Sequence, residues 1–153
     1  MKIVLLWVGK TKNSNLLSLL HRYEERIGHF CELLQKEVKA AEEVETDRVV
    51  AKEGERLLAK IQPDDYVVAL DALGESLTSE ELGALIADKK NHSLKNLVFV
   101  VGGHWGLSMS VKTRANKLLS LSRMTLSHEM TRLILVEQIY RAFTWIHHIP
   151  YHK

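Results

Sequence analysis

The sequence predicts one α/β domain over residues 1–153, with a mostly parallel sheet and helices on both faces. Short apolar runs alternate with segments of helical periodicity along the whole chain. The runs are continuously apolar, which is typical of strands buried on both sides. No linker, repeat or low-complexity segment interrupts them, and 46% hydrophobic with 26% charged residues excludes collagen-like and disordered classes.

The first half of the chain supplies two strands and two helices. Residues 3–8 predict a buried strand, and the helix after it begins at Asn13 or Ser14 as N-cap. Its apolar stripe consists of Leu16, Leu20, Tyr23 and Ile27. A weaker strand over residues 32–38 leads through an acidic stretch to a helix near residues 47–61. Val50, Leu57 and Ile61 share one face of that helix.

The second half continues the alternation. A strand over residues 66–71 ends in an acid, and the spacing of residues 78–81, Thr-Ser-Glu-Glu, is that of a capping box. The clearest strand, residues 97–101, runs into a glycine-rich turn. A helix carrying Val111, Ala115 and Leu118 should follow the turn. The connecting segment 121–128 precedes a long helix over residues 131–146 and a short tail.

Charge is unevenly distributed along the chain. Residues 1–88 carry 11 Lys and Arg against 17 Asp and Glu, whereas residues 89–153 carry 10 against 2. Six of the eight histidines also lie in the second part. This distribution fits a polyanionic partner, and it equally fits an ordinary solvated surface that is basic.

Several functional classes are excluded or disfavoured. No apolar run reaches the ~20 residues of a membrane span, and the N-terminus does not resemble a cleavable signal, so we expect a cytoplasmic protein without a membrane partner. The only cysteine, Cys31, is interpreted as a small buried hydrophobe. We expect no metal site, and the glycines match neither a dinucleotide fingerprint nor a P-loop.

Ligands of parallel sheets bind where the strands end, and two strand ends are marked here. One is Leu70-Asp71, and the other is the turn at residues 102–106, which holds three glycines in five residues. The hydroxyl-rich segment 121–128 is either a plain connecting loop or a ligand-reading one. Tyr151 and His152 in the tail are proton-transfer residue types, provided that the tail is not disordered.

Together these segments resemble the ribosomal RNA large-subunit methyltransferase H family of the SPOUT class. The matching motifs span nearly the whole chain and are Val8-Gly9, Lys52-Glu53-Gly54-Glu55, Leu70-Asp71 with Gly74, Val101-Gly102-Gly103-x-x-Gly106, Leu121-Ser122-x-Met124-Thr125-Leu126-x-His128, Arg132, Glu137-Gln138-x-Tyr140-Arg141-Ala142 and Pro150-Tyr151-His152. Their order and spacing are jointly specific. His104 and Trp105 are bulkier than that turn usually carries, and we expect Trp105 to cover the cofactor rather than stack on RNA.

The resemblance implies a homodimeric S-adenosylmethionine-dependent methyltransferase acting on N3 of a pseudouridine in 23S rRNA. It also implies a C-terminal trefoil knot around the cofactor, whereas the pattern alone predicts an unknotted sheet. We expect the cofactor to be bound mainly by main-chain groups of Leu70, Gly102, Gly103, Leu121, Ser122, Arg123, Met124, Thr125 and Leu126. The alternatives are a SPOUT enzyme of different RNA specificity and a catalytically silent RNA-binding protein.

Transfer to the imide nitrogen N3 requires loss of its proton, for which His152 with Tyr151 is the candidate catalytic pair. Arg132 and Arg141 are candidates for RNA contact, either to phosphates or to negative charge on the uracil oxygens. The alternative for Arg141 is a pair with Glu137 one turn earlier. The long helix should also form the dimer interface. Leu133, Val136, Tyr140 and Phe143 form one stripe, and Ile134, Ile139 and Trp145 fall outside it.

Overall fold

The computed structural model describes residues 1–151, and its sheet has five strands in the order β2-β1-β4-β3-β5. The strands are β1 (Lys2–Val8), β2 (Leu33–Val38), β3 (Tyr66–Ser76), β4 (Asn96–Val101) and β5 (Lys117–Ser120). The helices are α1 (Ser14–Gly28), α2 (Thr46–Leu58), α3 (Ser79–Asn91), α4 (Met109–Arg114) and α5 (His128–Ile146). Every neighbouring pair of strands is parallel, which confirms the predicted class.

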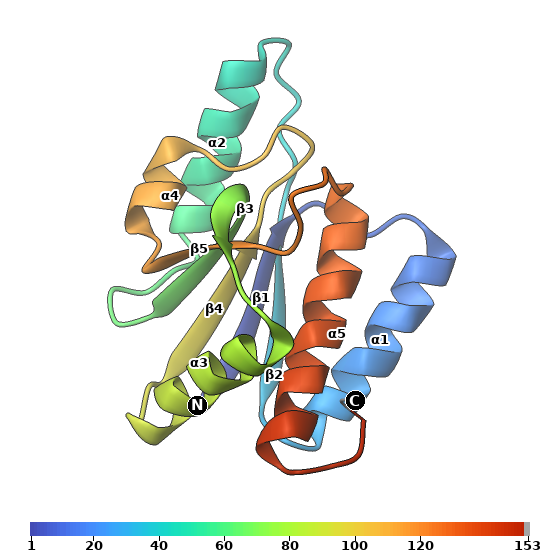
Figure 1. Ribbon diagram of the computed structural model, residues 1–153. Helices are drawn as coiled ribbons and strands as arrows, with labels where there is room; N and C mark the ends of the chain where they lie inside the picture. The colour runs from blue at the N-terminus through green and yellow to red at the C-terminus, as the bar shows by residue number, and fades with distance from the viewer. Residues whose placement is uncertain (152–153) are drawn as a thin grey trace.

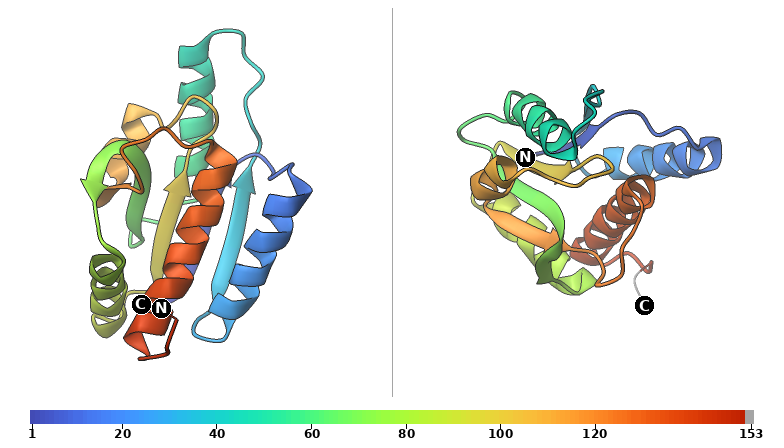
Figure 2. Two further views of the ribbon diagram at one scale, coloured as in Figure 1. Left: turned by 45° about the vertical axis from the view of Figure 1, so that its right-hand side comes forward. Right: turned by 90° about the horizontal axis from the view of Figure 1, so that it is seen from above.

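Helices cover both faces of the sheet, as predicted (Figure 2). Successive residues of β1 are buried on opposite sides, because side chains alternate along a strand. Ile3, Leu5 and Trp7 enter the core shared with α1, α3 and α5. Val4, Leu6 and Val8 enter a second core with α2 and α4. Cys31 packs at the edge of the first core, where burial raises the pKa of its thiol to about 11, in agreement with a hydrophobe-like role.

Sequence capping signals set several helix starts. The side chain of Asn13 accepts hydrogen bonds from the amides of Asn15 and Leu16, so it is the N-cap of α1. The capping box before α3 is complete, with Thr78 and Glu81 bonding each other's amides. In α2 Leu57 is buried as predicted, but the other buried apolar residue is Val49, whereas Val50 is only partly buried and Ile61 lies beyond the end of the helix.

The predicted helix through Leu118 is wrong, because α4 ends at Arg114 and Leu118 lies in β5 opposite Ala69. Asn116 explains the break. Its amide donates to the carbonyl of Val67 at 2.8 Å, and its side-chain oxygen accepts from the amide of Val67 at 2.8 Å. These two bonds tie the chain to β3 and turn it into a fifth strand.

Strand β3 is longer than predicted and irregular in its middle. It pairs with β5 at residues 68–70 and again at residues 75–76, and the residues between them bulge out of the ladder. Gly74 allows this, because a Cβ there would lie 2.7 Å from the carbonyl carbon of Leu118. The bulge leaves Leu70 and Asp71 beside the carboxyl ends of β4 and β5.

After β5 the chain returns as an irregular segment, residues 121–127, across the carboxyl ends of the strands and enters α5 (Figure 1). Helix α5 packs between α1 and α3, and its fully buried residues include Val136 and Phe143 of the predicted stripe as well as Ile139, which lies outside that stripe. The trefoil knot stays a prediction. Within residues 1–151, no helix combines the length and apolar character needed to cross a membrane.

Candidate active site

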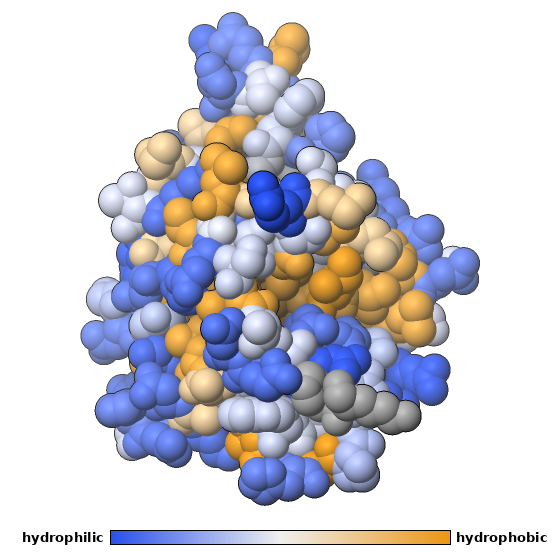
Figure 3. All heavy atoms as spheres, viewed as in Figure 1, coloured by the Kyte–Doolittle hydropathy of each residue, from blue (hydrophilic) through white to orange (hydrophobic). Residues whose placement is uncertain are grey.

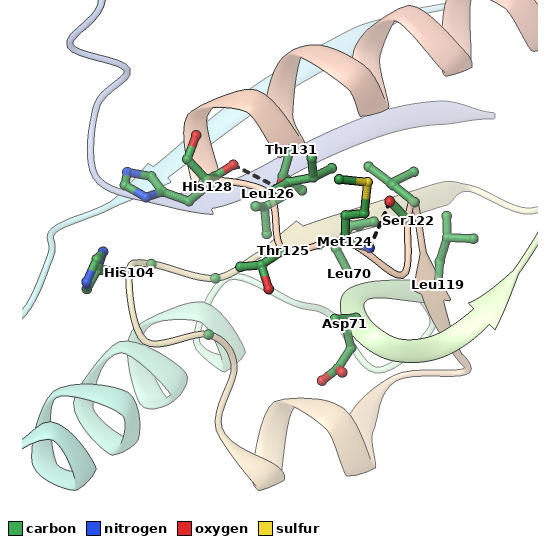
Figure 4. A pocket seen from close by; sticks show the side chains of 17 residues that line it. Leu70, Asp71, His104, Leu119, Ser122, Met124, Thr125, Leu126, His128 and Thr131 are labelled. Atoms are coloured by element: carbon green, nitrogen blue, oxygen red, sulfur yellow. Dashed lines mark hydrogen bonds between the residues drawn. The ribbon is translucent and has the colours of Figure 1, made fainter.

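A cleft of about 430 Å³ lies at the carboxyl ends of β3, β4 and β5 (Figure 4). Its walls come from the end of β3, the glycine turn after β4, segment 121–127 and the first turn of α5. Eight of the nine residues predicted to bind a cofactor line it, namely Leu70, Gly102, Gly103, Leu121, Ser122, Met124, Thr125 and Leu126. The ninth, Arg123, is exposed and does not line the cleft.

The glycine turn needs glycine for steric reasons. A Cβ on Gly102 would lie 2.6 Å from the carbonyl carbon of Gly106, so the two ends of the turn are in direct main-chain contact. Gly106 has a φ of +82°, in the left-handed region, and its amide donates to the carbonyl of Gly103 at 3.2 Å. Apart from the side chain of His104, the turn therefore presents main chain to the cleft.

Segment 121–127 is held by serine hydroxyls instead of by main-chain pairing. The amide of Met124 donates to the hydroxyl of Ser122 at 3.0 Å (Figure 4), and the hydroxyl of Ser120 donates to the carbonyl of Ser122 at 2.9 Å. Among the described residues, the main-chain groups of Arg123, Thr125 and Leu126 form no hydrogen bond. Main-chain donors and acceptors are thus available to a ligand, which is the condition for the predicted mode of binding.

Asp71, at the end of the regular part of β3, is fixed in place. It forms an ion pair with Lys112 and accepts from the amide of Leu73 at 2.8 Å. Burial acts to raise the pKa of Asp71, but the bonds from Lys112 and Leu73 outweigh it and the pKa is lowered. The carboxylate is ionised and already neutralised by its partner.

His128 is the titratable group that sequence reasoning missed at the cleft, although it belongs to the motif after β5. It is the first residue of α5, behind the N-cap Ser127, and its ring lies across the cleft mouth from His104 (Figure 4). Burial lowers the pKa of His128, and the charge of Arg132 one turn later lowers it further. The imidazole is therefore neutral at neutral pH and able to accept a proton.

Arg132 does not face solvent, contrary to its prediction as an RNA contact. Its side chain is fully buried and donates to the hydroxyl of Thr11 at 2.9 Å and to the carbonyl of Val8 at 2.5 Å. The guanidinium also lies over the ring of Trp7, 5.1 Å from its centroid. Arg132 joins α5 to the end of β1, and a phosphate cannot reach it in this structure.

Arg141 and Tyr151 lie along the middle of α5, away from the cleft lining. Arg141 pairs with Glu137 at 2.6 Å, which confirms the intrahelical alternative, and its guanidinium lies over the ring of Tyr151. The hydroxyl of Tyr151 donates to Glu137 at 3.1 Å. Burial, followed by hydrogen bonding to Tyr23 and the charge of Glu137, raises the pKa of Tyr151. Its predicted partner His152 lies outside the described residues.

Trp105 was expected to cover the cofactor, but the structure does not place it there. Its side chain is 56% exposed and does not line the cleft. Its ring packs edge-on against His104, which does line the cleft. Among the described residues, no three histidine, cysteine or acidic side chains are grouped so as to hold a metal ion.

Comparison with known proteins assigns the chain to a family. Residues 1–152 match the family model described as "Predicted SPOUT methyltransferase". A solved structure of a probable methyltransferase from Bordetella pertussis Tohama I superposes with a TM-score of 0.58 over 92% of this chain and 95% of that one. At 12% identity, it supports the fold alone.

Closer relatives carry the name ribosomal RNA large subunit methyltransferase H. The protein of that name from Carboxydothermus hydrogenoformans is 44% identical, with 100% of both chains covered. The one from Christiangramia forsetii is 39% identical with 99% of both covered. The chain belongs to the SPOUT methyltransferases and, within them, to the family of these relatives, so it is a methyltransferase.

Proposed function

We propose that the protein transfers a methyl group from S-adenosylmethionine to N3 of a pseudouridine in 23S rRNA of the assembled ribosome, in the cytoplasm. The names of the relatives support a ribosomal RNA substrate. The observation that carries the proposal is the cleft, where a glycine turn exposes its main chain and segment 121–127 presents unpaired main-chain groups. A catalytically silent RNA-binding protein would have no use for such a cleft.

The residues present fit S-adenosylmethionine. A cleft of about 430 Å³ suits a ligand of this size. Leu70, Gly102, Gly103 and the main chain of segment 121–127 would hold it. When bound, S-adenosylmethionine supplies a methyl group on a cationic sulfur, and transfer to nitrogen breaks the carbon–sulfur bond, leaves its electron pair on sulfur and displaces the N3 proton.

The chain offers two imidazoles for that proton. His128 stands at the cleft mouth of the same chain in its neutral form. His152 follows Tyr151, which bonds to the middle of α5 within its own chain, so the tail would serve the cleft of a second copy. Tyr151 itself is a proton donor to Glu137 with a raised pKa, which disfavours it as a base.

This division of labour requires a homodimer, and we propose that its interface lies at α5. Hydrophobic side chains gather on the surface over α5 and α1 (Figure 3), and Leu19 and Met130 are both more than one-third exposed there. Such an area is typical of an interface. Analytical ultracentrifugation at micromolar concentration should give twice the chain mass, and a monomer would contradict the interface.

Exposed cations beside the cleft are better placed for RNA than Arg132. Lys10 and Lys12 follow β1, and Arg123 projects from segment 121–127. All three side chains are exposed. Contacts from such residues to phosphates position an RNA without reading its sequence.

The decisive experiment uses ribosomes from a strain in which the gene is deleted. The purified protein is incubated with these ribosomes and S-adenosylmethionine, and the rRNA nucleosides are identified by mass spectrometry. We expect a single N3-methylated pseudouridine. Methylation of a different nucleotide indicates another RNA specificity, and absence of donor binding by calorimetry indicates a silent RNA-binding protein.

A further inference from the structure

Glu53, on α2, lies directly behind the glycine turn. It is 5% exposed, and one carboxylate oxygen accepts from the amide of Ala41 at 3.0 Å. The other oxygen, Oε2, has no partner among the described residues. A Cβ built on Gly103 would lie 2.6 Å from Oε2. The carboxylate therefore packs against Gly103, and Gly103 lines the cleft.

Close packing between helices fixes this carboxylate. A Cβ on Gly54, the next residue of α2, would lie 2.1 Å from the hydroxyl oxygen of Ser108. Ser108 is the N-cap of α4 and follows the glycine turn in the chain. Helix α2 thus rests on the segment that leaves the turn, which leaves Glu53 little freedom to move away from it.

The negative charge of Glu53 is not compensated by the protein. The basic side chains that precede and follow it on α2 are engaged elsewhere, because Lys52 pairs with Glu43 and Arg56 donates to the carbonyl of Lys39. Asp71, the acid at the cleft wall, is neutralised by Lys112. Within residues 1–151, no cation contacts Glu53. A buried carboxylate without a cation opposes folding, so its presence calls for a role in the loaded protein.

We propose that Glu53 is a specificity-determining residue that makes the cleft favour a cationic ligand over a neutral one. This inference rests on the proposed function: the donor S-adenosylmethionine carries a sulfonium charge, and the product S-adenosylhomocysteine is a neutral thioether at that sulfur. A charge separated from the cleft by one glycine acts through a low-dielectric wall, where attraction is strong and screening by salt is weak. Glu53 therefore tightens donor binding and leaves product binding nearly unaffected, which promotes exchange of product for donor.

The experiment compares two ligands on three proteins. Isothermal titration calorimetry measures the affinities of S-adenosylmethionine and S-adenosylhomocysteine for the wild type, Glu53→Gln and Glu55→Gln. Glu55 is an exposed residue of α2, so its variant makes the same change in net charge away from the cleft. In Glu53→Gln we expect the donor affinity to fall about tenfold and the product affinity to change less than about twofold. Glu55→Gln should keep the wild-type ratio.

A purely structural role predicts a different result. If Glu53 only held the glycine turn, both affinities would fall together in Glu53→Gln, and this outcome overturns the inference, as do two unchanged affinities. If Glu53→Gln does not fold, Glu53→Met removes the charge with an apolar side chain of similar length and is expected to show the same shift in ratio. Wild-type protein that binds neither ligand would overturn the proposed function itself, whereas an unchanged ratio with tight binding overturns the inference alone.

Discussion

Helix α5 carries two arginines, one near the cleft and one past its middle, and their surroundings differ. At the cleft end, Arg132 is fully buried and bonds to the end of β1 through a main-chain carbonyl and a threonine hydroxyl. Nine residues later, Arg141 remains partly exposed and is held by one carboxylate and one aromatic ring. The presence of an arginine on a helix therefore does not show whether its side chain is available to bind another molecule.

The difference extends to the residues around them. The cleft end of α5 is fixed by main-chain bonds, since Glu129 accepts from the amides of Lys12 at 2.8 Å and Asn13 at 3.3 Å. Around the middle of the helix, side-chain contacts dominate instead, and Glu137 accepts hydrogen bonds from Arg141 and Tyr151. Side-chain clusters can exchange partners without disturbing a helix. The cleft end of α5 is thus suited to preorganised binding, and the region around Glu137 is suited to contacts that form on assembly.

The largest expected effect concerns the tail. If His152 takes the N3 proton, His152→Ala should lower the single-turnover rate of ribosome methylation by ~10²–10⁴-fold. Truncation after Ile149 should remove transfer altogether. Both variants should bind S-adenosylmethionine with wild-type affinity in calorimetry, because the cleft is untouched.

His128→Ala is the matched comparison at the cleft end of the helix. A loss of that size in His128→Ala, with an active His152→Ala protein, would reassign the proton acceptor to the cleft. Full single-turnover activity after truncation would refute a catalytic tail.

The second-largest expected effect is on protein stability, which should differ between variants of the two arginines. Arg132→Met leaves the carbonyl of Val8 and the hydroxyl of Thr11 without their buried donor, and should reduce the free energy of unfolding by about 2–4 kcal/mol. Arg141→Met removes a partly exposed ion pair and should reduce the free energy of unfolding by about 0–1 kcal/mol. Urea denaturation followed by circular dichroism measures the free energy of unfolding of both variants. Equal losses would show that burial does not distinguish the two sites.

Much of this architecture could be predicted from residue patterns, and the failures have physical causes. The glycine turn and the loop at residues 121–126 lie at the cleft as predicted. Both could be found because the ends of apolar runs and clusters of glycine are visible in the sequence. Strand β5 was missed, since four residues carry too little periodicity and Asn116 acts through a partner 49 residues away.

Site roles were harder to predict than site position. Arg132 was predicted to contact RNA, and only the fold shows that its donors bond to Val8 and Thr11 in the interior. Glu53 stood in a family motif, but no role could be assigned to it, because its place behind Gly103 depends on how α2 packs against the glycine turn. Interactions between residues distant in sequence decide both cases.

A smaller effect is expected for Arg123, which we propose in place of Arg132 as an RNA contact. Arg123→Ala should weaken ribosome binding several-fold and reduce the salt dependence of that binding by about one unit of logarithmic slope. Donor affinity should not change, because Arg123 does not line the cleft. Filter binding at several salt concentrations measures the slope. An unchanged slope would place the RNA elsewhere, and a weakened donor affinity would return Arg123 to the cofactor.

The smallest effect is a pH dependence that originates at the cleft end of α5. Burial and the charge of Arg132 lower the pKa of His128 in the folded protein, whereas in the unfolded chain it is about 6.5. As pH falls, the unfolded chain therefore binds this proton first, and the stabilisation by His128, complete above pH ~6.5, is lost as pH falls through the folded pKa.

Thermal unfolding at pH 7.5, 6.5 and 5.5 should show a smaller decline of the unfolding temperature in His128→Gln than in the wild type. His29→Gln, which removes an exposed imidazole away from the cleft, is the control and should decline like the wild type. Equal declines in all three proteins would mean that His128 takes up its proton as easily when folded as when unfolded, and that the buried arginine does not influence the cleft.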